Sequence, residues 1–192
     1  MKNLHRIFIA INLPLKLQNE LSAYQDQWLE LPARWTRPEN LHITLNYLGN
    51  ANDEEICDIC SLAAQVVKRH EPIEITLNRI CYGPLRKFPP RMIWAVGEKS
   101  GTLGRLQMDF ENTLHEFAGA DSDTATDCTF APHVTLARVK QTELKMMEAE
   151  EIPVIDETIK RNFLVDSIEV MESEMKRGGP NYIILESIKL GE

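Results

Sequence analysis

Short runs rich in Val, Ile and Leu recur along the chain, in part with alternating apolar and polar residues, and this is the pattern of β-strands. The runs cover residues 6–13, 41–48, 73–81, 91–96, 132–139, 163–171 and 182–190. Between them, apolar residues return with a period near 3.6, which predicts amphipathic helices. The three apolar stripes are Leu17, Leu21, Tyr24 and Trp28; Ile56, Ile59, Cys60, Ala63 and Val67; and Leu103, Leu106, Phe110, Leu114 and Phe117. This mixture predicts an α+β fold.

Polar residues, prolines and glycines predict where these elements begin and end. Asn52, followed three residues later by Glu55, has the form of a capping box at a helix start. Gly49 is expected to close the strand 41–48. The segment 83–90 is rich in proline and glycine and predicts a loop, and the polar, acidic segment 119–128 predicts a flexible loop.

One short pattern occurs twice, as His42-Ile43-Thr44-Leu45 and His133-Val134-Thr135-Leu136. Side chains alternate between the two faces of a strand, so the His and the Thr of each copy share one face. The β-branched residue and the Leu share the other face, which must be buried. Two such strands side by side would form a cleft that holds two imidazoles and two hydroxyls.

The order strand, helix, connector, His-x-Thr strand also occurs twice, and the two histidines lie about half a chain apart. This repetition predicts an internal duplication, in which two α+β lobes are related by a pseudo-two-fold axis with the cleft on it.

Composition limits the class of protein. With 192 residues, 43% of them hydrophobic and 26% charged, the chain has the make-up of a globular protein, and no apolar run is long enough to span a membrane. The net charge of −8 argues against binding of long nucleic acid over the whole surface, so contact with nucleic acid is expected to be local.

The four cysteines and the N-terminus bear on the compartment. Cys57 and Cys60 form a CxxC on a predicted helix without a second pair, so we expect reduced core thiols, with Cys81 and Cys128, rather than zinc. The apolar stretch 7–11 is broken soon afterwards by polar Asn12 and is expected to be a strand rather than a signal peptide. A cytoplasmic location follows as an expectation.

Two histidines across a cleft suit general acid–base catalysis near neutral pH, because one imidazole can be neutral while the other is protonated. Displacement at phosphorus needs this pair of states, and the hydroxyls of Thr44 and Thr135 can stabilise the phosphate oxygens. One His-x-Thr alone is a weak pattern that is more often structural, but two copies in a repeated unit favour catalysis. A metal site built on both histidines is the competing interpretation; it lacks carboxylate or Cys partners at ligand spacing, so we expect neither metal nor cofactor.

The chain resembles the 2H phosphoesterases, and among them the RNA 2′,3′-cyclic phosphodiesterases, also called bacterial-type 2′-5′ RNA ligases. The similarity covers nearly the whole chain. It is carried by the segments Arg6–Ile11, Asn40–Leu45 with Leu48-Gly49, Phe88–Arg91 with Trp94, Phe130–Arg138, and Gly179–Tyr182 with Leu185.

The resemblance implies a bilobal α+β fold with two antiparallel sheets, outer helices and a central groove, so that residues 1–192 form one domain of two intertwined lobes. It also implies hydrolysis of an RNA 2′,3′-cyclic phosphate to a 2′-phosphate. In the family's roles His42 donates a proton to the leaving 3′-oxygen, His133 accepts one from water, and Arg138 binds phosphate. The reverse reaction, with a 5′-hydroxyl in place of water, is 2′-5′ ligation.

Further residues could complete an RNA site. Trp35, Phe88 and Tyr182 could stack on bases, although each could equally be a packing residue. A positive rim could be formed by Arg34, Arg37, Arg86, Lys87, Lys176 and Arg177.

Two other functions stay open at this point. The substrate could be a small cyclic-phosphate nucleotide or a 2′-5′ oligoadenylate, or the groove could bind RNA without turnover. Nothing in the sequence implies an obligate protein partner, and a monomer is expected.

Overall fold

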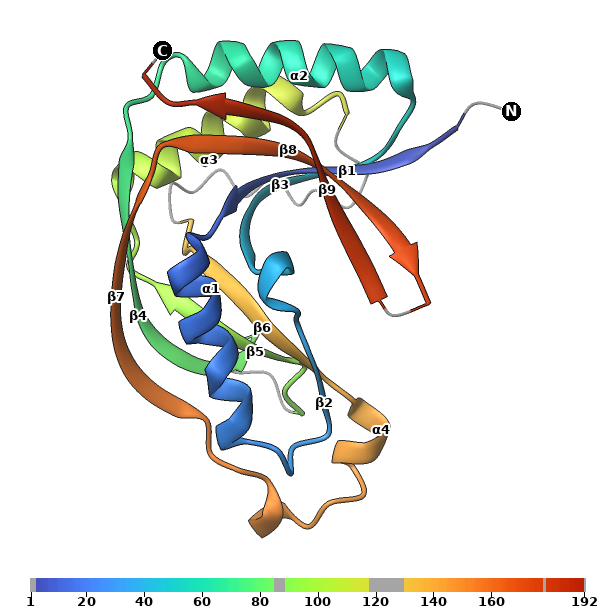
Figure 1. Ribbon diagram of the computed structural model, residues 1–192, viewed down its shortest axis with the longest axis vertical. Helices are drawn as coiled ribbons and strands as arrows, with labels where there is room; N and C mark the ends of the chain where they lie inside the picture. The colour runs from blue at the N-terminus through green and yellow to red at the C-terminus, as the bar shows by residue number, and fades with distance from the viewer. Residues whose placement is uncertain (1–2, 85–88, 118–129, 178, 192) are drawn as a thin grey trace.

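The computed structural model describes residues 3–84, 89–117, 130–177 and 179–191, and its described strands, apart from β2 (Ala33–Trp35), lie on one antiparallel path (Figure 1). The strands are β1 (His5–Asn12), β2 (Ala33–Trp35), β3 (His42–Ala51), β4 (Ile73–Gly83), β5 (Met92–Gly97), β6 (His133–Val139), β7 (Asp156–Val165), β8 (Ser167–Lys176) and β9 (Gly179–Lys189). The α-helices are α1 (Leu15–Ser22), α2 (Asp53–Val67), α3 (Gly101–Leu114) and α4 (Gln141–Leu144), with 3₁₀ turns η1 (Ala23–Gln27), η2 (Pro38–Asn40) and η3 (Ala149–Glu151).

The strand path has two halves that meet at the His-x-Thr strands. Its order is β7-β4-β5-β6 in one half and β3-β1-β8-β9 in the other. The short strand β2 pairs with residues 137–139 of β6, beyond the point at which β6 pairs with β3. A single registered pair, Ile43 with Val134, joins β3 to β6. Both side chains are fully buried, so the middle residues of the two motifs form the junction between the halves.

The connections on the two sides of this junction correspond. The chain runs from β1 through α1 to β3 in one half and from β5 through α3 to β6 in the other, and in each case the first strand pairs with the His-x-Thr strand. The predicted fold class, α+β with antiparallel strands and a duplicated unit, is confirmed. Instead of two separate sheets, however, the two halves are joined through Ile43 and Val134 into one nine-stranded sheet.

Helix α2 shows how local sequence fixes an element. The side chain of Asn52 accepts hydrogen bonds from the backbone N–H groups of Glu54 and Glu55, and Glu55 accepts one from the Asn52 backbone, which confirms the predicted capping box. Its buried face, which includes Ile59 and Ala63, packs on α3 and on strands β8 and β9 (Figure 1).

The first helix and two strands differ from their predicted bounds. Helix α1 ends at Ser22 and continues as η1. Strand β3 runs past Gly49, which has φ +82° and follows a bulge at Leu48, so this glycine permits the bulge instead of ending the strand. The predicted strand 163–171 is wrong, because β7 ends at Val165 and β8 begins at Ser167. The residues of the main core change there from odd numbers (Phe163, Val165) to even numbers (Ile168, Val170), which marks a break that simple alternation hides.

The cysteines are free thiols where the structure describes them, but they are not all in the core. Cys57 is exposed and Cys60 is half-buried on α2, which corrects the expectation of core thiols for that pair, while Cys81 is buried in β4. Cys57 lies outside the predicted apolar stripe of α2, on the polar face of the helix, which is why it is exposed. Cys128 and the predicted loop 119–128 fall in a part of the chain outside the described residues.

The buried core gathers on one face of the sheet path, and a second, small apolar cluster lies on the other. The main core includes the junction pair and the buried faces of the helices. The second cluster is Phe8, Ala10 and Met171, with Tyr182 packed against it. Within the described ranges, no helix has the length and apolarity needed to cross a membrane.

We predict that the junction is sensitive to a single methylene. Ile43→Val should lower the free energy of unfolding by about 1 kcal/mol, measured by urea denaturation, and should also shift the backbone amide resonances of His42 and Thr135. The matched control is Ile59→Val in α2, which is equally buried. It should lose similar stability and leave those resonances in place; equal shifts in both variants would contradict the junction's role.

Candidate active site

The His-x-Thr residues share one face of the junction. Since Ile43 pairs with Val134 in antiparallel register, His42 is on the side of Thr135 and Thr44 on the side of His133. All four line one pocket of about 460 Å³, here called the two-histidine pocket. Its size suits a nucleotide-sized ligand. The structure thus brings the two histidines and two threonines together.

Two β-bulges determine which further residues reach the pocket. On β6 the register shifts at Leu136, so Arg138 joins the face of His133 and Thr135 instead of the opposite one. On β3 the register shifts at Leu45, which brings Tyr47 to the face of His42. Both Arg138 and Tyr47 line the two-histidine pocket.

Backbone carbonyls fix the orientation of both imidazoles. Nδ1–H of His42 donates to the carbonyl of Asn40 at 2.8 Å, and Nδ1–H of His133 donates to the carbonyl of Ala131 at 3.3 Å. A carbonyl can only accept, so in the neutral form each Nε2 has a free lone pair. Nε2 of His42 lies 3.0 Å from Oγ of Thr44, whose hydroxyl can donate to it. Each Nε2 can therefore accept or release a proton.

Burial lowers the pKa of both histidines below the ordinary value. For His42 the burial effect is followed by a smaller opposing effect of the Asn40 carbonyl and by the charge of His133, which lowers the pKa further. For His133 burial is again the main cause, opposed by the Ala131 carbonyl. Because each charge disfavours the other, the pair favours carrying one proton over carrying two.

Aromatic rings surround the imidazoles. The Tyr182 ring meets His42 edge-on with centroids 5.0 Å apart, and Phe8 lies 5.2 Å from His42. Trp94, on the neighbouring strand β5, lies 4.3 Å from His133. Trp35 lines the pocket and also stacks on Trp28 at 6.2 Å, so it has a packing role in addition to any contact with ligand. Phe88 falls outside the described residues.

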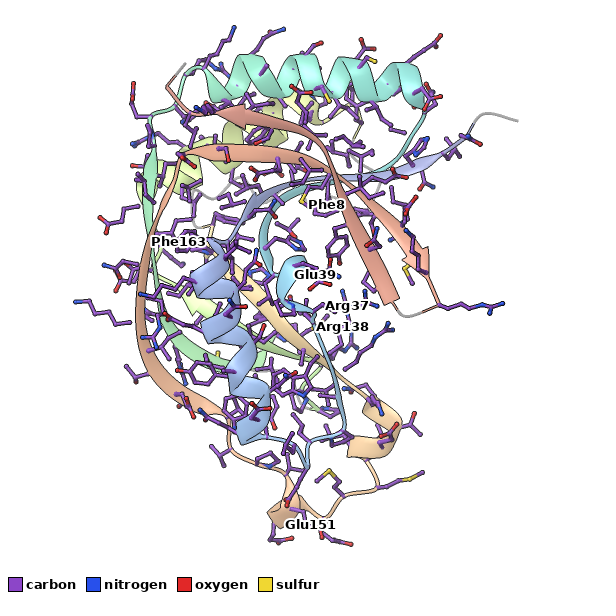
Figure 2. All side chains as sticks on the ribbon, in the orientation of Figure 1. Phe8, Arg37, Glu39, Arg138, Glu151 and Phe163 are labelled. Atoms are coloured by element: carbon purple, nitrogen blue, oxygen red, sulfur yellow. The ribbon has the colours of Figure 1, made fainter. Side chains whose placement is uncertain are left out.

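Arginines supply the positive charge of the pocket. Arg6, Arg34, Arg37 and Arg138 line it, and Figure 2 shows Arg37 and Arg138 on the side of the molecule that faces the β8–β9 hairpin. Of the predicted rim, Arg34 and Arg37 are therefore at the pocket. Lys176 and Arg177, at the hairpin tip, are not among its lining residues, and residues 86 and 87 lie outside the described ranges.

Sequence reasoning missed several pocket residues. Arg6, Phe8, Asn40 and Tyr47 were not singled out as site residues, although all four stand next to or within the quoted motif segments. Asn40 holds the β8–β9 hairpin, because its side-chain amide donates to the carbonyl of Pro180 at 2.9 Å. Tyr47 and Arg138 each lie five residues after a motif His, and this shared spacing was the available signal for both. In a regular strand, residues five apart point to opposite faces, so the spacing indicates the pocket only if a bulge lies between them.

No cluster of three or more metal-ligating side chains occurs in the part of the chain that the structure describes. The CxxC residues lie on α2, away from the pocket lining.

The fold and part of the sequence are similar to those of known proteins. The family model described as "LigT like Phosphoesterase" matches residues 11–94, which contain the first His-x-Thr motif. The crystal structure of TT0787 of Thermus thermophilus superposes with a TM-score of 0.80 at 27% identity, covering 97% of this chain and 98% of that one. The crystal structure of E. coli LigT complexed with 3′-AMP superposes with a TM-score of 0.77 at 22% identity, over 99% of this chain and 100% of that one, which shows the shared fold.

Particular relatives carry a named activity. The RNA 2′,3′-cyclic phosphodiesterase of Methanocaldococcus jannaschii is 25% identical, covering 94% of this chain and 98% of its own length. The protein of the same name from Thermus thermophilus is 28% identical, covering 96% of this chain and 90% of its own. The resemblance to the 2H phosphoesterases that the two motifs indicate is confirmed.

We predict that the imidazoles titrate in a defined order. In the ligand-free protein His42 and His133 should titrate below pH 6.5 because burial disfavours their charge, as imidazole NMR can measure. His5 is the internal control: its contact with Glu172 at 2.7 Å raises its pKa, so it should titrate above 6.5. Inorganic phosphate should raise the first two values; titration of either pocket histidine above that of His5 in the free protein would contradict the assignment.

Proposed function

We propose that this protein hydrolyses RNA 2′,3′-cyclic phosphate ends to 2′-phosphomonoesters, without a metal, by a two-histidine acid–base mechanism. The observation that carries the proposal is the pairing of the two His-x-Thr strands at Ile43 and Val134, which presents two Nε2 atoms and two hydroxyls to one pocket. The name that the relatives carry, RNA 2′,3′-cyclic phosphodiesterase, supports the substrate class.

In the proposed reaction water attacks phosphorus and gives its proton to neutral Nε2 of His133. Protonated Nε2 of His42 gives its proton to the 3′-oxygen as the bond from phosphorus to that oxygen breaks. The hydroxyls of Thr44 and Thr135 and the guanidinium of Arg138 stabilise the non-bridging oxygens as charge develops. The backbone carbonyls on both Nδ1 atoms keep the imidazoles oriented during the transfer. The resemblance assigns which His is donor.

The same groups permit attack by a second nucleophile. A 5′-hydroxyl in the place of water would give 2′-5′ ligation through the same proton transfers: it attacks phosphorus, gives its proton to His133, and the 3′-oxygen again leaves with a proton from His42. We propose this as a secondary activity. We also propose that a monomer, with residues 1–192 as one domain, carries out the reaction. Free thiols at the described cysteines are compatible with action in the cytoplasm.

A second substrate class has its own support. A pocket of about 460 Å³ can hold a single nucleotide, so small cyclic-phosphate nucleotides are the alternative to RNA ends. Comparing a 2′,3′-cyclic nucleotide, a cyclic-ended oligonucleotide and a 2′-5′ oligoadenylate separates these substrates. Binding without turnover of any of them would identify a non-catalytic module.

Loss of either imidazole should abolish most turnover. His42→Ala and His133→Ala should each lower kcat on a cyclic-ended oligonucleotide by about 10²–10⁴-fold, the usual contribution of a general acid or base. His115→Ala is the matched control, because His115 is exposed at the end of α3 and outside the pocket. Circular dichroism checks the fold, and EDTA should leave the wild-type rate unchanged. Near-normal turnover in either pocket variant would refute the mechanism.

The pH dependence and the product test the roles. The rate should rise with pH as the base loses its proton and fall as the acid loses its own, which gives a bell. Since burial lowers both pKa values in the free protein and a bound phosphate anion raises them, the bell for kcat should lie at higher pH than the bell for kcat/KM. Phosphorus NMR should identify a 2′-phosphate. A 3′-phosphate would reverse the donor assignment, and a flat profile would exclude the acid–base pair.

A further inference from the structure

Tyr47 and Arg138 occupy equivalent positions in the two halves. Each lies five residues after the motif histidine, and in each strand a bulge between the Thr and this position turns its side chain to the pocket face. The pseudo-two-fold relation at the Ile43–Val134 junction therefore places Tyr47 opposite Arg138, on the other side of the histidine pair. The half with Arg138 has a positive charge at this position. The half with Tyr47 has a neutral side chain there, so a positive charge on that side must come from another residue.

Arg6 supplies that cation. Its Nε–H donates to the hydroxyl oxygen of Tyr47 at 3.0 Å, and its guanidinium lies 5.8 Å from the centre of the Tyr47 ring. With its oxygen accepting from Arg6, the Tyr47 hydroxyl keeps its own proton to donate, and the terminal nitrogens of Arg6 keep theirs. The described residues show no carboxylate in an ion pair with Arg6. The pair is thus a set of donors facing the pocket.

The pocket holds more positive groups than one phosphate needs, even though Arg37 lies 4.0 Å from Glu39 in an ion pair. The described lining holds four arginines and neither Asp nor Glu, in a chain of net charge −8. A cyclic phosphate end carries a single negative charge, and Arg138 with the two threonines can bind it. Burial raises the pKa of Tyr182, and the charges of Arg138 and Arg6 both oppose this rise, so both guanidinium groups lie near that ring. Two cationic groups therefore act on Tyr182 within one pocket.

We propose that Arg6 and Tyr47 form a second phosphate subsite, which binds the phosphodiester next to the cyclic end of an RNA strand. This inference rests on the proposed function and specifies its substrate: a strand of at least two nucleotides is recognised through two phosphates, one on each side of the histidine pair. The local positive site explains how an acidic protein can bind RNA ends. A mononucleotide lacks the second phosphate and cannot use the pair.

The test compares two substrates that share the reacting end. Rates are measured for a 2′,3′-cyclic mononucleotide and for a trinucleotide with the same terminal base and a 2′,3′-cyclic end. Arg6→Gln removes the charge and Tyr47→Phe removes only the hydroxyl. Arg105→Gln is the matched control, because Arg105 is an exposed arginine on α3 outside the pocket lining.

Arg6→Gln should lower kcat/KM for the trinucleotide at least roughly tenfold more than for the mononucleotide, mainly through KM, as expected for the loss of a charge-assisted hydrogen bond. Tyr47→Phe should change the same ratio in the same direction by a smaller factor. The dependence of log KM on log salt for the trinucleotide should become shallower by about 0.7 in Arg6→Gln, the value for one phosphate contact on a single strand. Arg105→Gln should leave both substrates and the salt slope as in the wild type.

Equal losses on both substrates, or no loss on either, would overturn the subsite while leaving the proposed function intact. If the wild type turned over neither substrate, the proposed function would fail. In that case calorimetry would measure the affinity of each variant for a trinucleotide ending in a 2′-phosphate and for the corresponding 2′-mononucleotide. A larger loss of affinity for the trinucleotide in Arg6→Gln and Tyr47→Phe would support the subsite, and equal losses would overturn it.

Discussion

One registered pair of residues, Ile43 with Val134, is the constraint on which the site depends. It is the junction between two four-stranded halves of the strand path, and both side chains are fully buried. Burial of the middle residues places the flanking His and Thr on the opposite face, because side chains of a strand alternate. The packing of the core and the geometry of the pocket are thus set by the same contact.

The duplication gives the pocket two similar but unequal sides. Both imidazoles are oriented by a backbone carbonyl two residues earlier in the chain, and both strands contain a bulge after the Thr. The sides differ at the fifth residue after the His, where one has Arg138 and the other has Tyr47 with Arg6. Such a site can treat the two sides of a bound phosphate differently, as an acid and a base must.

Electrostatics separates the pocket from the rest of the surface. The chain is acidic as a whole, with a net charge of −8, yet the described pocket lining has arginines and no carboxylate. Positive charge confined to a pocket attracts a phosphate locally without making the whole surface bind nucleic acid. The lowered pKa values of the histidines follow from the same enclosure, because burial disfavours a charged imidazole.

The sequence by itself determined the elements that depend on local pattern: the alternating strands, the capping box at Asn52, and the His and Thr on one face of each repeated strand. It did not determine where a strand breaks or bulges, since these depend on pairing with distant strands; the break at Asp166 and the bulges at Leu45 and Leu136 were missed for that reason. Only the tertiary structure decided that Tyr47 and Arg6 join Arg138 at the pocket, because register between segments far apart in the chain is fixed by the packing of a shared core.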